Sequence, residues 1–252
     1  MTRVSFSIVT PTLNAERYLE QCLESVQAQD SVDLEHLVVD GGSTDRTEHI
    51  VAAHGANWLL RTGLTQTAAI NDGLRSAQGE IVAWLNADDL YTLGTLEFIA
   101  EQFCMHPTVE VVIGDCDVID AAGKLLWRVE PGPYSFRRLL ERGNTIAQPA
   151  VFLRRAVFDR VGYLDESLEF GMDYDLWLRL RSERVAYVPR VLAGFRWHAA
   201  SKTARNSRRS WREAMTIVRN HGGDWTPYLA WSFARARVTD ARRHIGARAR
   251  GR

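Results

Sequence analysis

The stretch that decides the fold is residues 34–54, LEHLVVDGGSTDRTEHIVAAH. Its first part is a short apolar run that ends on Asp40 and two glycines, and an amphipathic run with helical spacing follows at 46–54. A strand joined to a helix by a short loop is the repeating unit of a parallel sheet covered by helices. The stretch therefore predicts an α/β protein.

The same unit recurs on both sides of this stretch. Further strands are expected at 6–10, 57–61, 80–86 and 109–120, and further helices at 16–27, 67–77 and 93–103. Such alternation makes a mostly parallel central sheet flanked by helices. The pattern loosens after residue 120: helices are expected at 134–142 and 173–183, a strand at 150–155 and an extended run at 185–197. We therefore divide residues 1–203 into two halves, 1–120 and 121–203.

Composition limits the class of protein. The chain has 252 residues, of which 46% are hydrophobic and 25% charged, as in an ordinary globular protein with one sizeable core. The three cysteines show no C-x-x-C spacing, which fits a reducing compartment. No apolar run in the sequence approaches the roughly 20 residues of a membrane span. We expect a cytoplasmic protein.

The net charge of zero hides an asymmetry. Residues 202–252 carry 13 basic against three acidic side chains, a charge of +10, so residues 1–201 carry −10. Residues 204–252 are predicted to form a basic, aromatic helical tail. One interpretation is peripheral binding to an anionic membrane surface on the inner face of the membrane. The other is a solvated helix that packs on the body or forms an oligomer contact, such as a homodimer. Nucleic acid is not an expected partner, because no groove-reading motif accompanies the charge.

Acidic residues stand where expected strands end or a helix begins: Asp40, the pair Asp88 and Asp89, and Asp173. Ligands of open α/β sheets bind at the carboxyl ends of the strands. Carboxylate oxygens are the ligands that Mg²⁺ and Mn²⁺ prefer. The pattern predicts a site for a metal-bound nucleotide.

Five blocks in series make the sequence similar to the family 2 glycosyltransferases. They are SIVTPTLN (7–14), LVVDGGSTDRT (37–47), GEIVAWLNADD (79–89), GYLDESLEFGMDYDLWLRL (162–180) and FRWHAASKT (195–203). The resemblance covers about residues 4–203. It implies a GT-A fold, a nucleotide-diphosphate sugar donor, Mn²⁺ or Mg²⁺, and transfer with inversion. Residues 1–120 would then bind the nucleotide sugar, and residues 121–203 would form the acceptor half.

The resemblance also implies a metal site. Cleavage of the sugar–phosphate bond leaves a diphosphate whose growing charge a divalent cation neutralises. The D-x-D-like element is Asn86-Ala87-Asp88, followed by Asp89, so Asn86 replaces the first acid. We expect Asp89 to bind the metal, Asp88 to bind the metal or the ribose, and His198 to be a further ligand. The alternatives are that the acids cap a helix and that the histidine is structural.

Other residues match positions that bind the nucleotide sugar in the family. Asp40 would accept a hydrogen bond from uracil or thymine, and Thr10 and Pro11 would form the opposite wall, so we expect a donor linked to UDP or dTDP. Lys202 would contact the diphosphate. Three further matches, Gln66, Asn71 and Asn86, complete the expected donor site.

Asp173 is the candidate catalytic base. The acceptor hydroxyl has a pKa far above neutrality, so it needs a carboxylate within hydrogen-bond reach. In the related motif a Glu-Asp pair often begins the helix, and here Met172 replaces the glutamate. Asp173 could also be an N-cap of the helix that follows.

Competing functions are weaker matches. A sugar nucleotidyltransferase would open with a glycine-rich, basic loop, which VTPTLNAER is not. A dinucleotide-dependent oxidoreductase needs G-x-G-x-x-G, which is absent from the sequence. A catalytically inactive sugar-nucleotide-binding module stays open. The expected function is a metal-dependent inverting glycosyltransferase that moves one sugar to a saccharide or lipid-linked saccharide in cell-envelope or exopolysaccharide synthesis.

Overall fold

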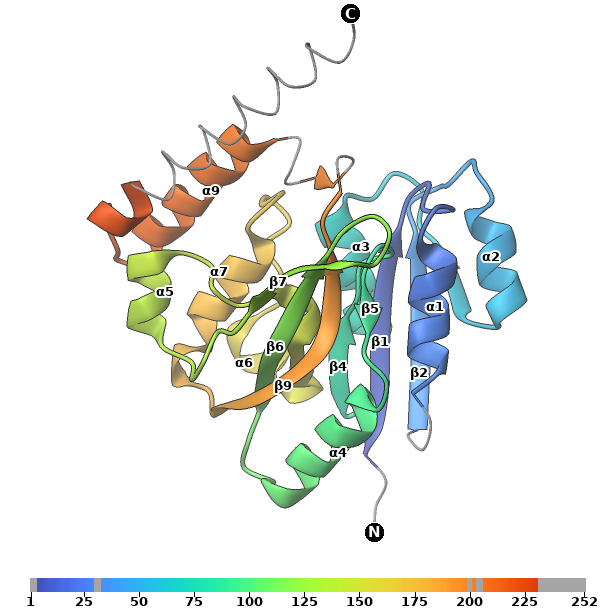
Figure 1. The fold of residues 1–252 in the computed structure, drawn as a ribbon, viewed down its shortest axis with the longest axis horizontal. Coiled ribbons are helices and arrows are strands. Elements are labelled where there is room, and N and C mark those ends of the chain that lie inside the picture. The colour runs from blue at the N-terminus through green and yellow to red at the C-terminus, as the bar shows by residue number, and fades with distance from the viewer. Residues whose placement is uncertain (1–3, 30–32, 199–200, 203–205, 231–252) are drawn as a thin grey trace, which may run out of the picture.

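The computed structural model describes residues 4–29, 33–198, 201–202 and 206–230. Within them, one sheet is covered by helices on both faces (Figure 1). Its strands are β1 (Ser5–Thr12), β2 (Asp33–Asp40), β3 (Asn57–Leu60), β4 (Ile81–Trp84), β5 (Leu90–Tyr91), β6 (Val111–Ile119), β7 (Leu125–Val129), β8 (Val151–Arg154) and β9 (Val185–Arg196). The helices are α1 (Leu19–Gln27), α2 (Thr47–His54), α3 (Gln66–Ser76), α4 (Thr95–Met105), α5 (Phe136–Arg142), α6 (Phe158–Val161), α7 (Met172–Arg179) and α9 (Ser207–Asn220).

The strand order is β3-β2-β1-β4-β8-β6-β9-β5, and β7 pairs with the C-terminal half of β6. Strands β3, β2, β1 and β4 run parallel, as do β6 and β9, whereas β8 is antiparallel to both of its neighbours, β4 and β6. The predicted α/β class with a mostly parallel sheet is confirmed. Since β1, β2 and β4 are parallel neighbours, their carboxyl ends meet at one edge of the sheet.

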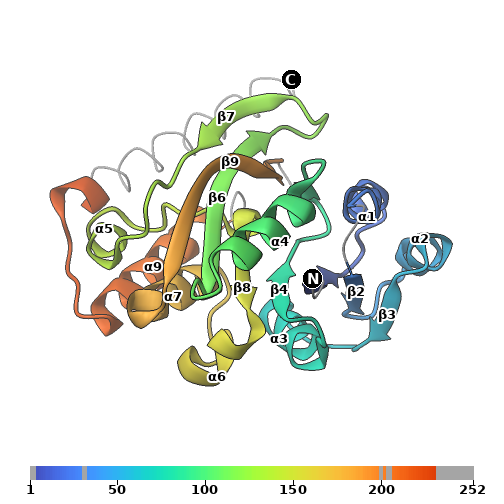
Figure 2. The same cartoon turned by 90° about the horizontal axis from the view of Figure 1, so that it is seen from below.

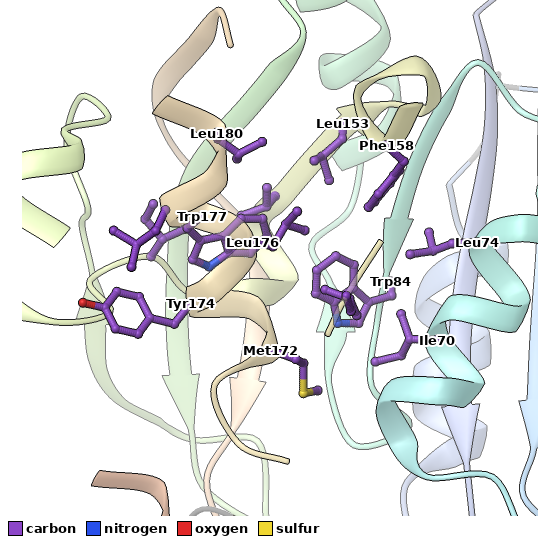
Figure 3. Packing of buried hydrophobic residues seen from close by; sticks show 14 of the residues in the cluster. Ile70, Leu74, Trp84, Leu153, Phe158, Met172, Tyr174, Leu176, Trp177 and Leu180 are labelled. Atoms are coloured by element: carbon purple, nitrogen blue, oxygen red, sulfur yellow. The ribbon is translucent and has the colours of Figure 1, made fainter. Parts of the chain in front are cut away.

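Period-two alternation divides the strands between two cores. On one face, Phe6 and Ile8 pack with residues of α1 and α4. On the other face, Val9 and Trp84 pack with residues of α3 and α7. Figure 2 shows α1 and α4 on one side of the sheet and α3 and α7 on the other. Figure 3 shows the second core, where the rings of Trp84 and Trp177 stack with centroids 5.7 Å apart. This packing fixes α7, and with it Asp173, relative to the end of β4.

The described part of the predicted tail packs on the body. Helix α9 lies beside α7 in Figure 1 and Figure 2, and its Met215, Ile217 and Val218 are buried in the same core as Trp177. Residues 204–205 and 231–252 of the predicted tail lie outside the described residues. Among the described residues, no helix combines the length and apolarity needed to cross a membrane.

Helix α3 lies close against the sheet because residue 73 has no side chain. A Cβ atom at Gly73 would lie 2.4 Å from Val9 Cγ1 and 3.1 Å from Val39 Cγ2, closer than carbon atoms pack. We expect Gly73→Ala to lower the free energy of unfolding by about 1–3 kcal/mol from overpacking, despite the better helix propensity of alanine. Urea denaturation measures this loss. The control Ser76→Ala, on the exposed end of the same helix, should change it by less than about 0.5 kcal/mol; equal losses would contradict the explanation.

Candidate active site

Two cavities meet at the carboxyl edge of the sheet. The first has a volume of about 740 Å³ and the second about 450 Å³. The wall they share consists of Gln66, Asn86, Asp88, Glu169 and Lys202. A ligand in one cavity therefore lies against a ligand in the other at Asp88. That arrangement suits a reaction between two bound molecules.

The loop after β4 is held by a network centred on Asn86. Its side-chain oxygen accepts a hydrogen bond from Gln66 Nε2 at 2.9 Å, and its amide nitrogen donates to Asp89 Oδ2 at 3.1 Å and to Gln148 Oε1 at 3.2 Å. Gln148 in turn donates to the carbonyl of Trp84 at 2.6 Å. Asn86 thus orients the loop, and its side chain also faces both cavities.

Asp89 is a buried residue of the loop after β4 and lines neither of the two cavities. Its side chain is 0% exposed, and it is not among the described residues that line a cavity. Its Oδ1 accepts the backbone N–H of Arg196 at 2.8 Å, and its Oδ2 accepts from Asn86. Burial, reinforced by the neighbouring Asp88 carboxylate, holds the pKa of Asp89 well above its usual range. In this structure Asp89 ties the β4 loop to the end of β9, and its binding of a metal stays a prediction.

Asp88, on the shared wall, lies beside His198, which lines the first cavity. Asp88 Oδ2 and His198 Nε2 share a hydrogen bond of 2.9 Å, and their side chains are 33% and 11% exposed. A carboxylate beside an imidazole suits Mn²⁺, which accepts both oxygen and nitrogen ligands. Among the described residues, no group of three or more His, Cys, Asp and Glu side chains could hold a metal by itself.

The expected base pocket is only partly assembled from the predicted residues. Pro11 lines the first cavity, next to Gly41. Asp40 is buried behind Gly41, and its Oδ1 accepts hydrogen bonds from the backbone N–H groups of Gly42 and Ser43 at 2.9 and 2.8 Å. Thr10 is fully buried, and its hydroxyl and His36 Nε2 share a hydrogen bond of 2.9 Å. The side chain of Thr10 therefore lies inside the sheet rather than on the wall.

Of the other residues expected to bind the donor, Lys202 lines the cavities and Asn71 does not. Lys202 lines both cavities, with its Nζ 3.4 Å from Gln66 Oε1, and burial lowers its pKa. Asn71 is fully buried: it donates to the carbonyl of Leu164 and to Glu166 Oε1, both at 2.9 Å. Asn71 thus anchors the loop after α6 to α3 rather than facing a cavity.

Asp173 lines the second cavity at the start of α7. Its Oδ1 accepts from the backbone N–H of Tyr174 at 2.7 Å and its Oδ2 accepts from Asn144 Nδ2 at 3.0 Å. Burial raises the pKa of Asp173 to about 6, although both hydrogen bonds act in the opposite direction. A carboxylate with this pKa is largely ionised at neutral pH and is a stronger base than an exposed aspartate.

The sequence interpretation missed several residues of the site. Asn144 comes from the loop after α5, and Trp127 comes from β7; both line the second cavity. Arg209, on α9, lines the first cavity and pairs with Glu169 at 2.6 Å. Asn144 stands four residues before Gln148-Pro149, and a proline of this kind is a usable sequence signal for a loop. Nothing in the local pattern around Trp127 or Arg209 distinguishes them from surface residues.

Comparisons with known proteins give the chain a context. Residues 7–162 match the model of the family described as "Glycosyl transferase family 2". A PGL/p-HBAD biosynthesis glycosyltransferase of Mycobacterium bovis is 33% identical over 186 residues, which cover 71% of this chain and 70% of that protein. An uncharacterized glycosyltransferase of Rickettsia typhi is 30% identical over 212 residues and 78% of this chain. The match spans 65% of the length of that Rickettsia relative.

Solved structures share the fold. Staphylococcus aureus TarS 1-349, in complex with UDP-GlcNAc, superposes with a TM-score of 0.69 at 19% identity, covering 96% of this chain and 73% of that one. A mannosyltransferase of Pyrobaculum calidifontis, in complex with GDP-Man and Mn²⁺, superposes with a TM-score of 0.65 at 21% identity, covering 99% of this chain and 76% of that one. These neighbours show that the fold is GT-A.

Proposed function

Because the chain belongs to glycosyltransferase family 2, we propose that it transfers one sugar from a nucleotide-diphosphate sugar to an acceptor hydroxyl, with inversion at the anomeric carbon. The observation that carries the proposal is the meeting of two cavities at Asp88, with Asp173 on the wall of the second. The donor would lie in the first cavity and the acceptor in the second. The acceptor oxygen would then approach the anomeric carbon from the side opposite the diphosphate, which is the geometry of a single inverting displacement.

In the first cavity, the nucleotide lies against the ends of β1 and β2. The small Gly41 lets a flat base approach the backbone. Asp40 uses Oδ1 within its own loop, and no hydrogen bond among the described residues involves its Oδ2. From the family resemblance we propose that Oδ2 accepts the N–H of uracil or thymine, hence a UDP- or dTDP-linked donor. Lys202 and Arg209 supply positive charge for the diphosphate.

Asp88 and His198 would hold the divalent metal, Mn²⁺ or Mg²⁺. Both side chains line the first cavity, and Asp88 Oδ2 lies 2.9 Å from His198 Nε2. The ion, when bound, would neutralise the charge that develops on the leaving diphosphate. The Mn²⁺ in the Pyrobaculum mannosyltransferase complex supports this assignment by analogy of fold. Asp89 keeps the loop in place, because its two oxygens hold Arg196 and Asn86.

Asp173 would take the proton of the acceptor hydroxyl as the new glycosidic bond forms. Asn144 holds the carboxylate at one oxygen and fixes its direction. Around it, aromatic side chains line the acceptor cavity: the rings of Trp127 and Trp197 lie 6.4 Å apart. Aromatic faces bind the C–H faces of sugar rings, so we propose a saccharide or lipid-linked saccharide acceptor. The name of the mycobacterial relative, which refers to PGL/p-HBAD biosynthesis, supports a role in cell-envelope glycan synthesis.

The test is transfer from a panel of UDP-, dTDP- and GDP-sugars to simple glycosides with Mn²⁺, followed by ¹H NMR of the anomeric proton in the product. An α-linked donor should give a β-linked product. Retention of configuration would contradict the single displacement. Nucleotide binding without transfer from any donor would instead favour an inactive binding module.

The acid limb of the pH–rate profile should report Asp173. The base must be ionised, so kcat/KM should fall as the pH drops through about 6. Asn144 donates to the carboxylate and so lowers its pKa; its removal must raise it. We therefore expect Asn144→Ala to move the acid limb to higher pH while nucleotide affinity at pH 8 stays unchanged. A limb that does not move, or that moves to lower pH, would show that another group titrates.

A further inference from the structure

Helix α9 lies outside the segment that matches the family model, yet it carries a carboxylate directed at the active-site loop. The helix is strongly basic on its exposed side, and Glu213 is its one acidic residue. Glu213 Oε1 accepts hydrogen bonds from the backbone N–H groups of Phe170 and Gly171, both at 2.6 Å. Its Oε2 accepts from the N–H of Glu169 at 3.0 Å. One carboxylate thus binds three consecutive backbone N–H groups.

The same loop is pressed against α9 by packing. A Cβ atom at Gly171 would lie 2.5 Å from Ile217 Cδ1, so the backbone touches the apolar face of α9 at this point. At the far end of the helix, His221 Nε2 and Asp175 Oδ1 share a hydrogen bond of 2.8 Å. Helix α9 is therefore fixed to the start of α7 at two points, on either side of Asp173.

The loop lies between the helix and the reaction site. Glu169, Phe170 and Gly171 line the second cavity, and α7 begins at the next residue, Met172, with Asp173 in its first turn. Gly171 is the N-cap of α7 and has no side chain to cap it. The Glu213 carboxylate, from a distant part of the chain, holds the backbone N–H groups of the three residues that lead into the helix, 169–171.

We propose that Glu213 is a positioning residue for the transfer reaction: by holding the N–H groups of residues 169–171, it fixes the place of the Asp173 carboxylate in the acceptor cavity. The proposal rests on the function proposed above. It assigns to α9 a part in the reaction, where the sequence favoured a tail outside the catalytic domain. A displacement of about 1 Å at a reacting group is sufficient to lower a rate by about 100-fold.

The charge of Glu213 also acts on Asp173, in addition to the hydrogen bonds that Glu213 accepts. The negative charge of Glu213 is one cause of the raised pKa of Asp173, after burial. The other charged side chains that line the same cavity are Asp88, Glu169, Arg196 and Lys202. Of these, only the first two would also raise the pKa of Asp173, and both stay in place when Glu213 is changed.

The experiment compares Glu213→Ala and Glu213→Gln with Arg212→Gln, which removes a charge from the adjacent, exposed position of α9. For Glu213→Ala we expect kcat to fall on the order of 100-fold while the affinity for the nucleotide stays within error. Glu213→Gln keeps one accepting oxygen and loses the charge, so its kcat should fall less, and the acid limb of its pH profile should move to lower pH. Arg212→Gln should behave as the wild type.

Hydrogen exchange gives a readout that does not depend on activity. The amide hydrogens of residues 169–171 should exchange faster in both Glu213 variants than in the wild type. In Arg212→Gln they should exchange at the wild-type rate. Unchanged kcat in both variants, or losses of kcat and nucleotide affinity that only follow a common loss of stability, would overturn the proposal. If Glu213→Ala does not fold, the test uses Glu213→Gln alone, through the amide exchange of residues 169–171 and the acid limb of its pH–rate profile. If the wild type transfers no sugar, the proposed function fails, and ¹³C NMR titration of the Asp173 carboxyl decides whether Glu213 controls it.

Discussion

Replacing Asp173 by asparagine is expected to lower the rate of sugar transfer by roughly 10³-fold and to leave nucleotide binding intact. The change preserves the shape of the side chain and its contact with Asn144, but the amide cannot accept the proton of the acceptor. The proposed nucleotide site lies in the other cavity, so the affinity for the nucleotide should not change. Single-turnover kinetics with saturating donor measures the chemical step directly.

The matched control is Asp159→Asn, the same chemical change at an exposed position of α6. It should leave both transfer and nucleotide binding at wild-type levels. A rate within tenfold of wild type for Asp173→Asn would exclude Asp173 as the base. Loss of nucleotide binding in the same variant would show that the two cavities do not divide donor from acceptor.

Alanine substitutions of the adjacent acids Asp88 and Asp89 are expected to have two different large effects. Asp88→Ala should fold normally and lose any increase in nucleotide affinity with Mn²⁺, because it removes one of the two proposed ligands of the ion. Asp89→Ala should instead destabilise the fold by about 2–4 kcal/mol, because the Arg196 N–H and the Asn86 amide lose their buried acceptor. Calorimetry with and without Mn²⁺ measures the first effect, and urea denaturation measures the second.

The opposite pattern would contradict these roles. A stable Asp89→Ala variant that no longer responds to Mn²⁺ would restore the sequence-based assignment of the metal to Asp89. Loss of stability in Asp88→Ala, comparable to that in Asp89→Ala, would mean that both acids are structural. Variants of Asp88 and His198 should show the same loss of the Mn²⁺ effect on nucleotide affinity, since their side chains face each other in the first cavity.

The α/β fold was predictable because strand and helix periods alternate over residues 4–120, and the site edge followed from the acids at strand ends. Strand β7 was missed. Its residues Leu125, Leu126 and Trp127 are all exposed, so they lack the alternation that marks a half-buried strand. The turn before β7 could have been recognised from the aspartate and glycine in residues 120–124, DAAGK. In the structure the Asp120 carboxylate accepts the N–H groups of Ala122 and Lys124 and closes this hairpin turn.

Periodicity also explains which site residues the sequence misplaced. Thr10 follows Phe6 and Ile8 at period two, so it shares their buried face of β1. Asn71 stands four residues after Thr67, on the side of α3 that packs inward. Family motifs mark such positions, but they do not distinguish a residue that lines the cavity from a buried residue that holds the cavity wall in place. The contact between Glu213 and residues 169–171 joins segments more than 40 residues apart, which no local pattern reveals.

The most direct test of a donor site beside Asp88 is calorimetric titration of the wild-type protein with UDP, dTDP, GDP and CDP, each with and without Mn²⁺. We predict that UDP or dTDP binds, that binding strengthens with Mn²⁺, and that the Mn²⁺ effect is absent in Asp88→Ala. Binding of none of the four nucleotides, or equal binding with and without the metal, would contradict a metal-assisted donor site in the first cavity.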